Sequence, residues 1–263
     1  MVIMMPAFFL AHGSPMIALE DTPYTRKLRE VGSKYRPRAI ILFSAHWESN
    51  VQAVGGAETY RTIYDFGGFP EALYRVTYPA HSDAKLVEEI STIFTGGGVE
   101  YLVDQSRGLD HGAWTLLRHI YPEADVPVVA MSVNANLAPA EQYRIGQALA
   151  QLRARDVMVI GSGVTVHNFG TINWNAPAGV PDAWAKEFDD WVLDKLTHWD
   201  TPALFAYETQ APHARKAVPP NGSEHFVPLF YTMGAAHETP SVKELHRQYE
   251  FGNLSYVLWQ FGQ

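Results

Sequence analysis

Cysteine does not occur among the 263 residues of the chain. This absence excludes disulfide frameworks, thiolate zinc sites, iron–sulfur clusters and cysteine nucleophiles. A metal ion would therefore have to bind nitrogen and oxygen ligands. Histidine, by contrast, occurs eleven times, so imidazole is the first side chain to consider as a ligand.

Positive charge is also scarce, since 20 lysine and arginine residues stand against 28 acidic ones and leave a formal net charge of −8. No basic patch is available to bind a phosphate backbone, so nucleic acid is not an expected partner. No apolar run reaches the roughly 18 residues that a membrane span needs, so no membrane partner is expected. The apolar residues 1–10 lack the basic region of a signal peptide and are predicted to form a first strand. These absences favour a cytoplasmic enzyme.

Short apolar runs alternate with longer amphipathic ones along the chain, a pattern typical of an α/β layered fold. Strands are predicted at residues 7–10, 39–44, 51–54, 99–103, 126–133, 157–162 and 256–259. Helices are predicted at residues 22–35, 83–94, 113–121, 139–154, 182–198 and about 224–235. Residues 55–79, rich in glycine, tyrosine and proline, are predicted to form a long functional loop. No linker interrupts the chain, so a single domain over residues 1–263 is expected.

Histidines follow three of the predicted strands. His12 comes just after the first strand, His46 closes the strand at 39–44, and His167 lies a few residues beyond the strand at 157–162. His111 lies at a loop-to-helix junction, and His225 follows a serine that could cap a helix. Because the carboxyl ends of parallel strands meet at one edge of a sheet, these five side chains are expected to share a metal or acid–base site. Surface or capping roles are expected for the other six: His81, His119, His198, His213, His237 and His246.

Local motifs for other chemistries are missing. Without a His-Glu-x-x-His motif, a metal site has to depend on side chains that converge from separate strand ends. The glycines at 161 and 163 lack the lysine of a P-loop and the spacing of a dinucleotide fingerprint, so a nucleotide site is not expected. A serine hydrolase centred on Ser14 is a weak alternative because no Gly-x-Ser-x-Gly elbow is present. The aromatic residues 64–74 suit either a flat ring substrate or simple loop packing.

Five ordered segments carry a resemblance to a known family. They are Leu-Ala-His-Gly-Ser-Pro-Met at 10–16, Ser-Ala-His-Trp at 44–47, Tyr-Asp-Phe-Gly-Gly-Phe-Pro at 64–70, Leu-Asp-His-Gly-Ala-Trp at 109–114 and Glu-His-Phe-Val-Pro-Leu at 224–229. Together they resemble the class III extradiol ring-cleavage dioxygenases, and most closely the DOPA 4,5-dioxygenase-like branch. The resemblance implies a three-layer α/β/α domain with a mixed, largely parallel sheet. It also implies a mononuclear non-haem metal, normally Fe(II), and a catechol substrate beside whose diol dioxygen is inserted.

The resemblance assigns the metal to His12 and His46. The third ligand is Glu224 or His225, and His225 is favoured because adjacent residues on a helix point about 100° apart. An all-histidine set would suit Zn(II) as well as Fe(II).

The resemblance also assigns acid–base roles. His167 matches the acid–base histidine of the family and could join the metal ligands when substrate is missing, and His111 matches a second active-site histidine. Tyr64 and Phe69 are the candidates for contact with the substrate ring.

Two other functions stay open on the same residues. A zinc-dependent hydrolase would use the histidines to activate water. A metal-binding protein that has lost catalysis would keep the fold alone, although it would need neither His111 nor His167. The sequence leaves the physiological catechol, the native metal and the oligomeric state undetermined.

Overall fold

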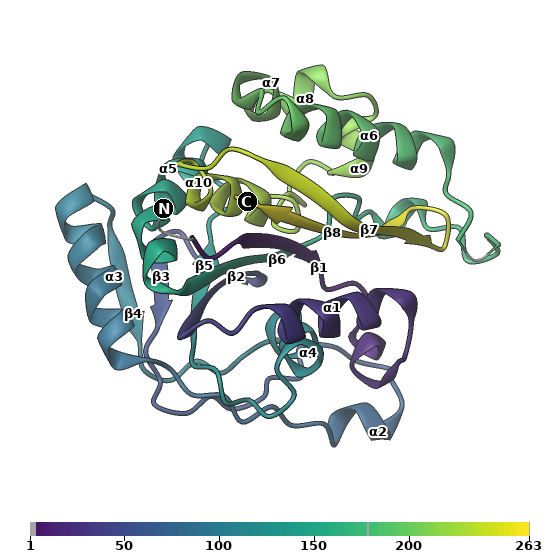
Figure 1. Ribbon diagram of the computed structural model, residues 1–263. Coiled ribbons are helices and arrows are strands. Elements are labelled where there is room, and N and C mark those ends of the chain that lie inside the picture. The colour runs from purple at the N-terminus through teal and green to yellow at the C-terminus, as the bar shows by residue number, and fades with distance from the viewer. Residues whose placement is uncertain (1–3, 178, 263) are drawn as a thin grey trace.

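The computed structural model describes residues 4–177 and 179–262, and within these ranges one eight-stranded sheet lies between two layers of helices (Figure 1). The strand order is β4-β3-β5-β2-β6-β1-β8-β7. The four central strands β5, β2, β6 and β1 are parallel, whereas β8 and β7 join antiparallel at one edge. The expected three-layer α/β/α fold with a mixed, largely parallel sheet is confirmed.

The strands are β1 (Ala7–Ala11), β2 (Ala39–Glu48), β3 (Gln52–Gly55), β4 (Tyr101–Asp104), β5 (Val128–Val133), β6 (Val157–Gly163), β7 (Val242–Glu250) and β8 (Leu254–Phe261). The α-helices are α1 (Pro23–Lys34), α2 (Glu71–Tyr74), α3 (Ala84–Gly97), α4 (His111–Ile120), α5 (Pro139–Ala148), α6 (Ala183–Thr197), α7 (Thr201–Phe205), α8 (Tyr207–Gln210), α9 (Ala214–Ala217) and α10 (Pro228–Ala235). Three short 3-10 helices complete the set: η1 (Pro15–Leu19), η2 (Ala150–Arg155) and η3 (Phe169–Thr171).

Alternate residues of the central strands enter two separate cores. Phe9 of β1 and Ile41 of β2 pack with α3, α5, α6 and α10 on one face of the sheet. Phe8 and Ile40, one residue earlier on each strand, pack with α1 and α4 on the other face. Figure 1 shows α1, α2 and α4 on one side of the sheet and α5, α6 and α10 on the other. Burial on both faces explains why these strands are continuously apolar in sequence.

The parallel register brings the carboxyl ends of the central strands to one edge. Ala11 of β1 pairs with Gly163 of β6, and Ser44 of β2 pairs with Ser162. The segments that follow β1 and β6, and the last residues of β2, therefore start from the same level of the sheet. This is the edge at which ligands bind in open α/β sheets.

Two predicted helices have other bounds in the structure, and some elements of the structure were not predicted. The helix expected near 224–235 begins only at Pro228, and residues 224–227 form turns. The helix expected at 139–154 divides into α5 and η2 at Leu149. Strand β7 was not predicted, because as an edge strand it carries many partly exposed polar residues and lacks an apolar run. No helix in the described part of the chain is long and apolar enough to cross a membrane.

Candidate active site

A cavity of about 620 Å³ opens at the carboxyl edge of the sheet and contains all five predicted histidines. Phenylalanine and tryptophan side chains make up much of its remaining wall. The lining residues are His12, Gly13, Ser14, Pro15, Met16, Glu20, His46, Asp65, Phe66, Phe69, His111, His167, Phe169, Ile172, Trp174, His225, Glu250, Phe251 and Leu254. The cavity has the size and apolar character of a site for a small molecule.

The end of β6 holds two of the histidines in place through the backbone. The amide of His12 donates to the carbonyl of Gly163, and the amide of Val164 donates to the carbonyl of His225 at 2.7 Å. A Cβ atom on Gly163 would lie 2.2 Å from the His225 carbonyl oxygen, so only glycine allows this approach. His12 and His225, more than 200 residues apart, are thus fixed to one strand end.

Each of the three histidines His12, His46 and His225 has a partner on Nδ1. Ser162 lies 3.0 Å from Nδ1 of His12 and itself donates to the carbonyl of Gly112, so its oxygen accepts the His12 proton. Asp65 lies 3.1 Å from Nδ1 of His46. Glu224 lies 2.9 Å from Nδ1 of His225. These acceptors assign the proton to Nδ1 in all three rings and leave the lone pair on Nε2.

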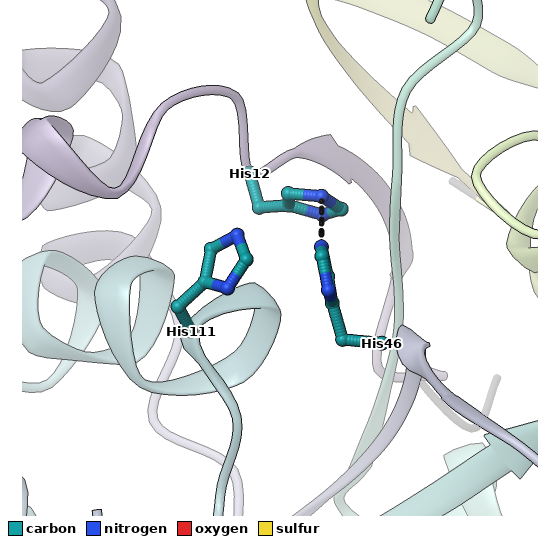
Figure 2. A group of neighbouring side chains, drawn as sticks. All are labelled: His12, His46 and His111. Atoms are coloured by element: carbon teal, nitrogen blue, oxygen red, sulfur yellow. Dashed lines mark hydrogen bonds between the residues drawn. The ribbon is translucent and has the colours of Figure 1, made fainter. Parts of the chain in front are cut away.

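The three Nε2 atoms converge. Nε2 of His46 lies 3.1 Å from Nε2 of His12 and 3.3 Å from Nε2 of His225. Figure 2 shows the first of these contacts, with the His111 ring beside the pair. Ligands bound at about 2.1 Å to one ion, at angles of about 90–110°, lie about 3.0–3.4 Å apart. Both separations from His46 fall in this range, and the ring centroids of His12 and His225 lie 5.1 Å apart. The three lone pairs fit a cation, because no proton is available to lie between them.

His111 forms a second arrangement with the same histidines. It begins α4, and Asp65 accepts hydrogen bonds from its backbone amide at 3.0 Å and from its Nδ1 at 2.9 Å. Ligand atoms of His12, His46 and His111 all lie within 4.8 Å of one another. Asp65 therefore bridges His46 and His111 and fixes both rings toward the cavity.

His167 stacks on His225 with ring centroids 3.6 Å apart and planes 12° from parallel. Its backbone amide donates to the carbonyl of Ala217, but no hydrogen bond to its ring is found in the described part of the chain. A ligand atom of His167 also lies within 4.8 Å of those of Glu224 and His225. The ring therefore faces the cavity beside His225 and is available to a bound molecule.

Burial and neighbouring imidazoles favour neutral histidine in the site. Burial, followed by the charges of the neighbouring histidines, lowers the pKa of His167 to about 2 and the pKa of His12 well below its usual range. Burial would raise the pKa of Asp65, but hydrogen bonds from His111 and His46 outweigh it and hold that pKa well below its usual range. Neutral imidazoles supported by an ionised carboxylate are the protonation states that metal binding requires.

The structure separates the two predicted substrate contacts. Phe69 lines the cavity, together with Phe66. Tyr64 is not among the described lining residues, since its hydroxyl donates to the carbonyl of Val76 at 2.7 Å and its ring packs beside Phe66 and Trp114. Tyr64 thus packs behind Phe66 and does not itself line the cavity.

Sequence reasoning missed the residues that orient the histidines. Asp65 was noted only as part of an aromatic segment, and Ser162 only as part of a glycine-rich strand end. The six remaining histidines do not line the cavity. Among them, His119 contacts the carbonyl of Ile17, His213 contacts Glu187, and His237 contacts Tyr143.

An open cluster of neutral imidazoles at the strand ends of an α/β sheet has the chemistry of a metal-binding active site. The family model described as the catalytic LigB subunit of aromatic ring-opening dioxygenase matches residues 6–259. The chain belongs to this family.

Relatives and a solved structure agree with this assignment. A protein named 4,5-DOPA dioxygenase extradiol from Beta vulgaris is 39% identical over 260 residues, which cover 97% of this chain and 95% of the relative. A protein of the same name from Escherichia coli K12 is 36% identical, with 98% and 95% covered. The crystal structure of an uncharacterized protein from Escherichia coli K12 superposes with a TM-score of 0.81 at 30% identity, covering 98% of this chain and all of that one.

Proposed function

We propose that the protein is an extradiol dioxygenase that opens the ring of a catechol beside its two hydroxyl groups. The carbon–carbon bond next to the diol breaks and both atoms of dioxygen enter the product, so no external reductant is needed. The convergence of three Nε2 lone pairs in an apolar cavity carries the proposal. The names of the relatives make DOPA the first substrate to test.

His12, His46 and His225 are the proposed metal ligands, with Ser162, Asp65 and Glu224 as their partners on Nδ1. Fe(II) in this place would supply a Lewis acid for the catechol oxygens and the redox chemistry that dioxygen requires. The same nitrogen atoms suit Zn(II), so a zinc-loaded preparation is expected to bind catechol without opening its ring. Glu224 is assigned to His225 as its hydrogen-bond partner, and His225 is the proposed third ligand.

His167 and His111 are the proposed proton-transfer residues. The His167 ring lines the cavity beside His225 and has no hydrogen bond in the described part of the chain, so a ring nitrogen is open to accept a proton from a catechol hydroxyl. Asp65 holds Nδ1 of His111, so Nε2 of this ring can receive a proton and pass it to an oxygen atom during ring opening. Phe66 and Phe69 bound the ring and exclude water. We also propose that residues 1–263 form one catalytic domain. A cytoplasmic location stays a prediction.

Oxygen uptake tests this function directly. Protein reconstituted anaerobically with Fe(II) is expected to consume dioxygen with catechols and to form a yellow ring-opened product. Consumption of no oxygen, together with hydrolysis of an ester or amide panel by the zinc-loaded protein, would favour the hydrolase instead. Loss of both activities with metal retained would indicate a binding protein.

The His46→Ala variant ties the activity to the cluster. It is expected to lose bound metal and ring cleavage together, because it removes the nitrogen that lies closest to both partner ligands. His198→Ala, at an exposed histidine on α6's carboxyl end, is the matched control and should retain both. Full metal occupancy in His46→Ala would contradict the site assignment.

A further inference from the structure

The charged residues in the cavity wall away from the histidines are acidic. Glu20 and Glu250 both line the cavity, and no lysine or arginine occurs among the described lining residues. Both side chains are half-buried. An anionic group on the substrate would therefore meet like charge on this wall, whereas a cation would find two carboxylates.

A hydrogen-bond chain fixes Glu250 relative to the histidine cluster. The hydroxyl of Tyr256 donates to Oε2 of Glu250 at 2.9 Å and accepts from the backbone amide of Ser14 at 2.9 Å. Between Ser14 and His12 lies Gly13, with φ of +53°, where a Cβ atom would lie 2.1 Å from the Tyr256 ring. The loop after β1 thus packs directly on Tyr256, so the carboxylate stands at a set position with respect to His12.

Neither carboxylate is neutralised by the protein. Among the described residues, Glu20 has no side-chain hydrogen bond or ion pair, and Glu250 has only the bond from Tyr256. Burial raises the pKa of Glu250, the Tyr256 hydroxyl opposes this, and the charge of Glu20 raises it further. A cation bound beside both groups would relieve this repulsion.

Aromatic rings complete the surroundings of Glu250. Its chain neighbour Phe251 packs against Trp174 with ring centroids 4.9 Å apart, and both rings line the cavity. Aromatic faces beside a carboxylate attract ammonium groups. The cavity is marked as a ligand site independently of these carboxylates, because the buried His12 and His225 turn their Nε2 lone pairs into it.

We propose that Glu250, assisted by Glu20, binds a protonated amine on the side chain of the catechol and so selects aminoalkyl catechols over catechols with a carboxylate alone. The inference rests on the proposed function for the placement of the diol at the histidines. Glu250 acts as a specificity-determining residue, since it contacts the substituent and not the reacting carbons. A carboxylate on the substrate is not required for recognition.

The test compares three catechols that differ only in their substituent: dopamine, 3,4-dihydroxyphenylpropionate and 4-methylcatechol. Anaerobic calorimetry with Fe(II)-loaded protein measures binding, and oxygen uptake measures kcat/KM. Wild-type protein is expected to favour dopamine over the carboxylate by about 10-fold or more, as opposed charges in a partly buried site do. DOPA, which carries both groups, should lie between them.

Glu250→Gln keeps an acceptor for Tyr256 and removes only the charge, so it should fold like the parent. It is expected to lose about 10-fold in kcat/KM for dopamine while 4-methylcatechol changes less than about twofold. Glu20→Gln should also lower the preference for dopamine, but by a smaller factor. Glu250→Asp keeps the charge and should retain part of the preference that Glu250→Gln loses. Glu58→Gln, an exposed residue outside the cavity, has the same change in net charge and should leave the preference unchanged.

Three outcomes overturn the proposal: equal affinity of wild-type protein for the three catechols, an unchanged preference in Glu250→Gln, or no binding of any catechol. If binding favours dopamine but no oxygen is consumed with any catechol, the proposed reaction fails while amine recognition stands. If oxygen is consumed equally with all three catechols, the proposed reaction stands and amine recognition fails.

Discussion

The orientation of His12, His46 and His225 depends on a second residue that holds Nδ1 of each ring. Ser162, Asp65 and Glu224 accept hydrogen bonds from Nδ1 of His12, His46 and His225 respectively, and this leaves Nε2 of each ring free to bind. Substitution of such partners weakens metal binding by about 10- to 100-fold in other metal sites, whereas loss of a ligand abolishes the site. Titration of each variant with metal can therefore distinguish a metal ligand from a residue that only orients a ligand.

Glu224 and His225 allow the clearest test of which residue is the ligand and which is its hydrogen-bond partner. Glu224→Gln keeps an oxygen that can accept the His225 proton, so the variant should bind one metal ion per chain with affinity reduced by no more than about 100-fold. His225→Ala should lose stoichiometric metal. Metal content after dialysis, with Fe(II) titration, separates them. Metal retained in His225→Ala and lost in Glu224→Gln would make the carboxylate the third ligand.

The His167→Ala variant tests proton transfer. The ring stacks on His225 and contacts Phe169, but it makes no hydrogen bond among the described residues, so its removal should leave the metal in place. Turnover is expected to fall by about 100-fold or more, because the proton acceptor for the catechol is lost. Steady-state oxygen uptake and metal analysis measure the two effects, with His213→Ala as a control outside the cavity. Unchanged turnover would remove His167 from the mechanism.

At the scale of elements, the parallel strands could be predicted and the segments between them could not. Strands β2, β5 and β6 are buried on both faces, so their apolar runs stand out in sequence. His12 and His167 follow the ends of β1 and β6, and His46 lies near the end of β2, so these strand ends predicted the place of the three histidines. Pro228 at the first turn of α10 was the available signal that the helix begins after His225, because proline is favoured there.

Asp65 and Glu250 show why the rest of the site escaped prediction. Asp65 lies in a long loop without periodicity, and its contacts with His46 and His111 bridge 19 and 46 positions along the chain. Glu250 ends an edge strand whose alternation is masked by partly exposed polar residues. No local pattern encodes either position, since both depend on how distant segments close around the cavity.

His119 links α4, η1 and α1 on the face of the sheet that α1 and α4 cover. From α4, its Nε2 donates to the carbonyl of Ile17 in η1 at 2.7 Å, and its Nδ1 accepts from Arg29 of α1 at 3.2 Å. Burial, with help from Arg29 and Arg118, lowers the pKa of His119 despite the bond to Ile17. The folded protein therefore holds a neutral ring at a pH where the unfolded chain is already protonated.

This linkage makes stability depend on pH. Below pH of about 6.5 the unfolded chain binds a proton at His119, whereas the folded state does not. The contribution of this residue to stability is therefore lost as pH falls. His119→Gln can make both hydrogen bonds without titrating, and its stability should fall less steeply between pH 7 and 5. Urea unfolding of metal-free protein at several pH values measures the difference. Parallel curves for the two proteins would contradict the linkage.

At the scale of the whole molecule, Arg153 joins both ends of the described chain. Its guanidinium is fully buried and donates to the carbonyls of Met5, Ala235 and Gly262. Burial lowers its pKa to about 10, so it is still charged at neutral pH. It supports the strands β1 and β8 from the edge of the sheet that lies opposite the cavity.

Arg153→Met should reduce the free energy of unfolding by about 3–5 kcal/mol, because three buried carbonyls lose their donors at about 1–3 kcal/mol each. Arg155→Met is the matched control: its exposed ion pair with Glu89 should contribute no more than about 1 kcal/mol. Equilibrium denaturation measures both variants. A loss from Arg153→Met no larger than that of the control would show that the carbonyls find other partners.

The contacts of Arg153 also determine how the enzyme could be mounted on a solid support. Strand β1 runs from Met5 toward His12, and β8 runs antiparallel to it and returns to Gly262. Because Arg153 donates to the carbonyls of both Met5 and Gly262, these two residues lie near each other. A bead or electrode coupled beside Met5 or Gly262 would therefore hold the molecule by the side opposite the cavity mouth and leave that mouth facing the solution.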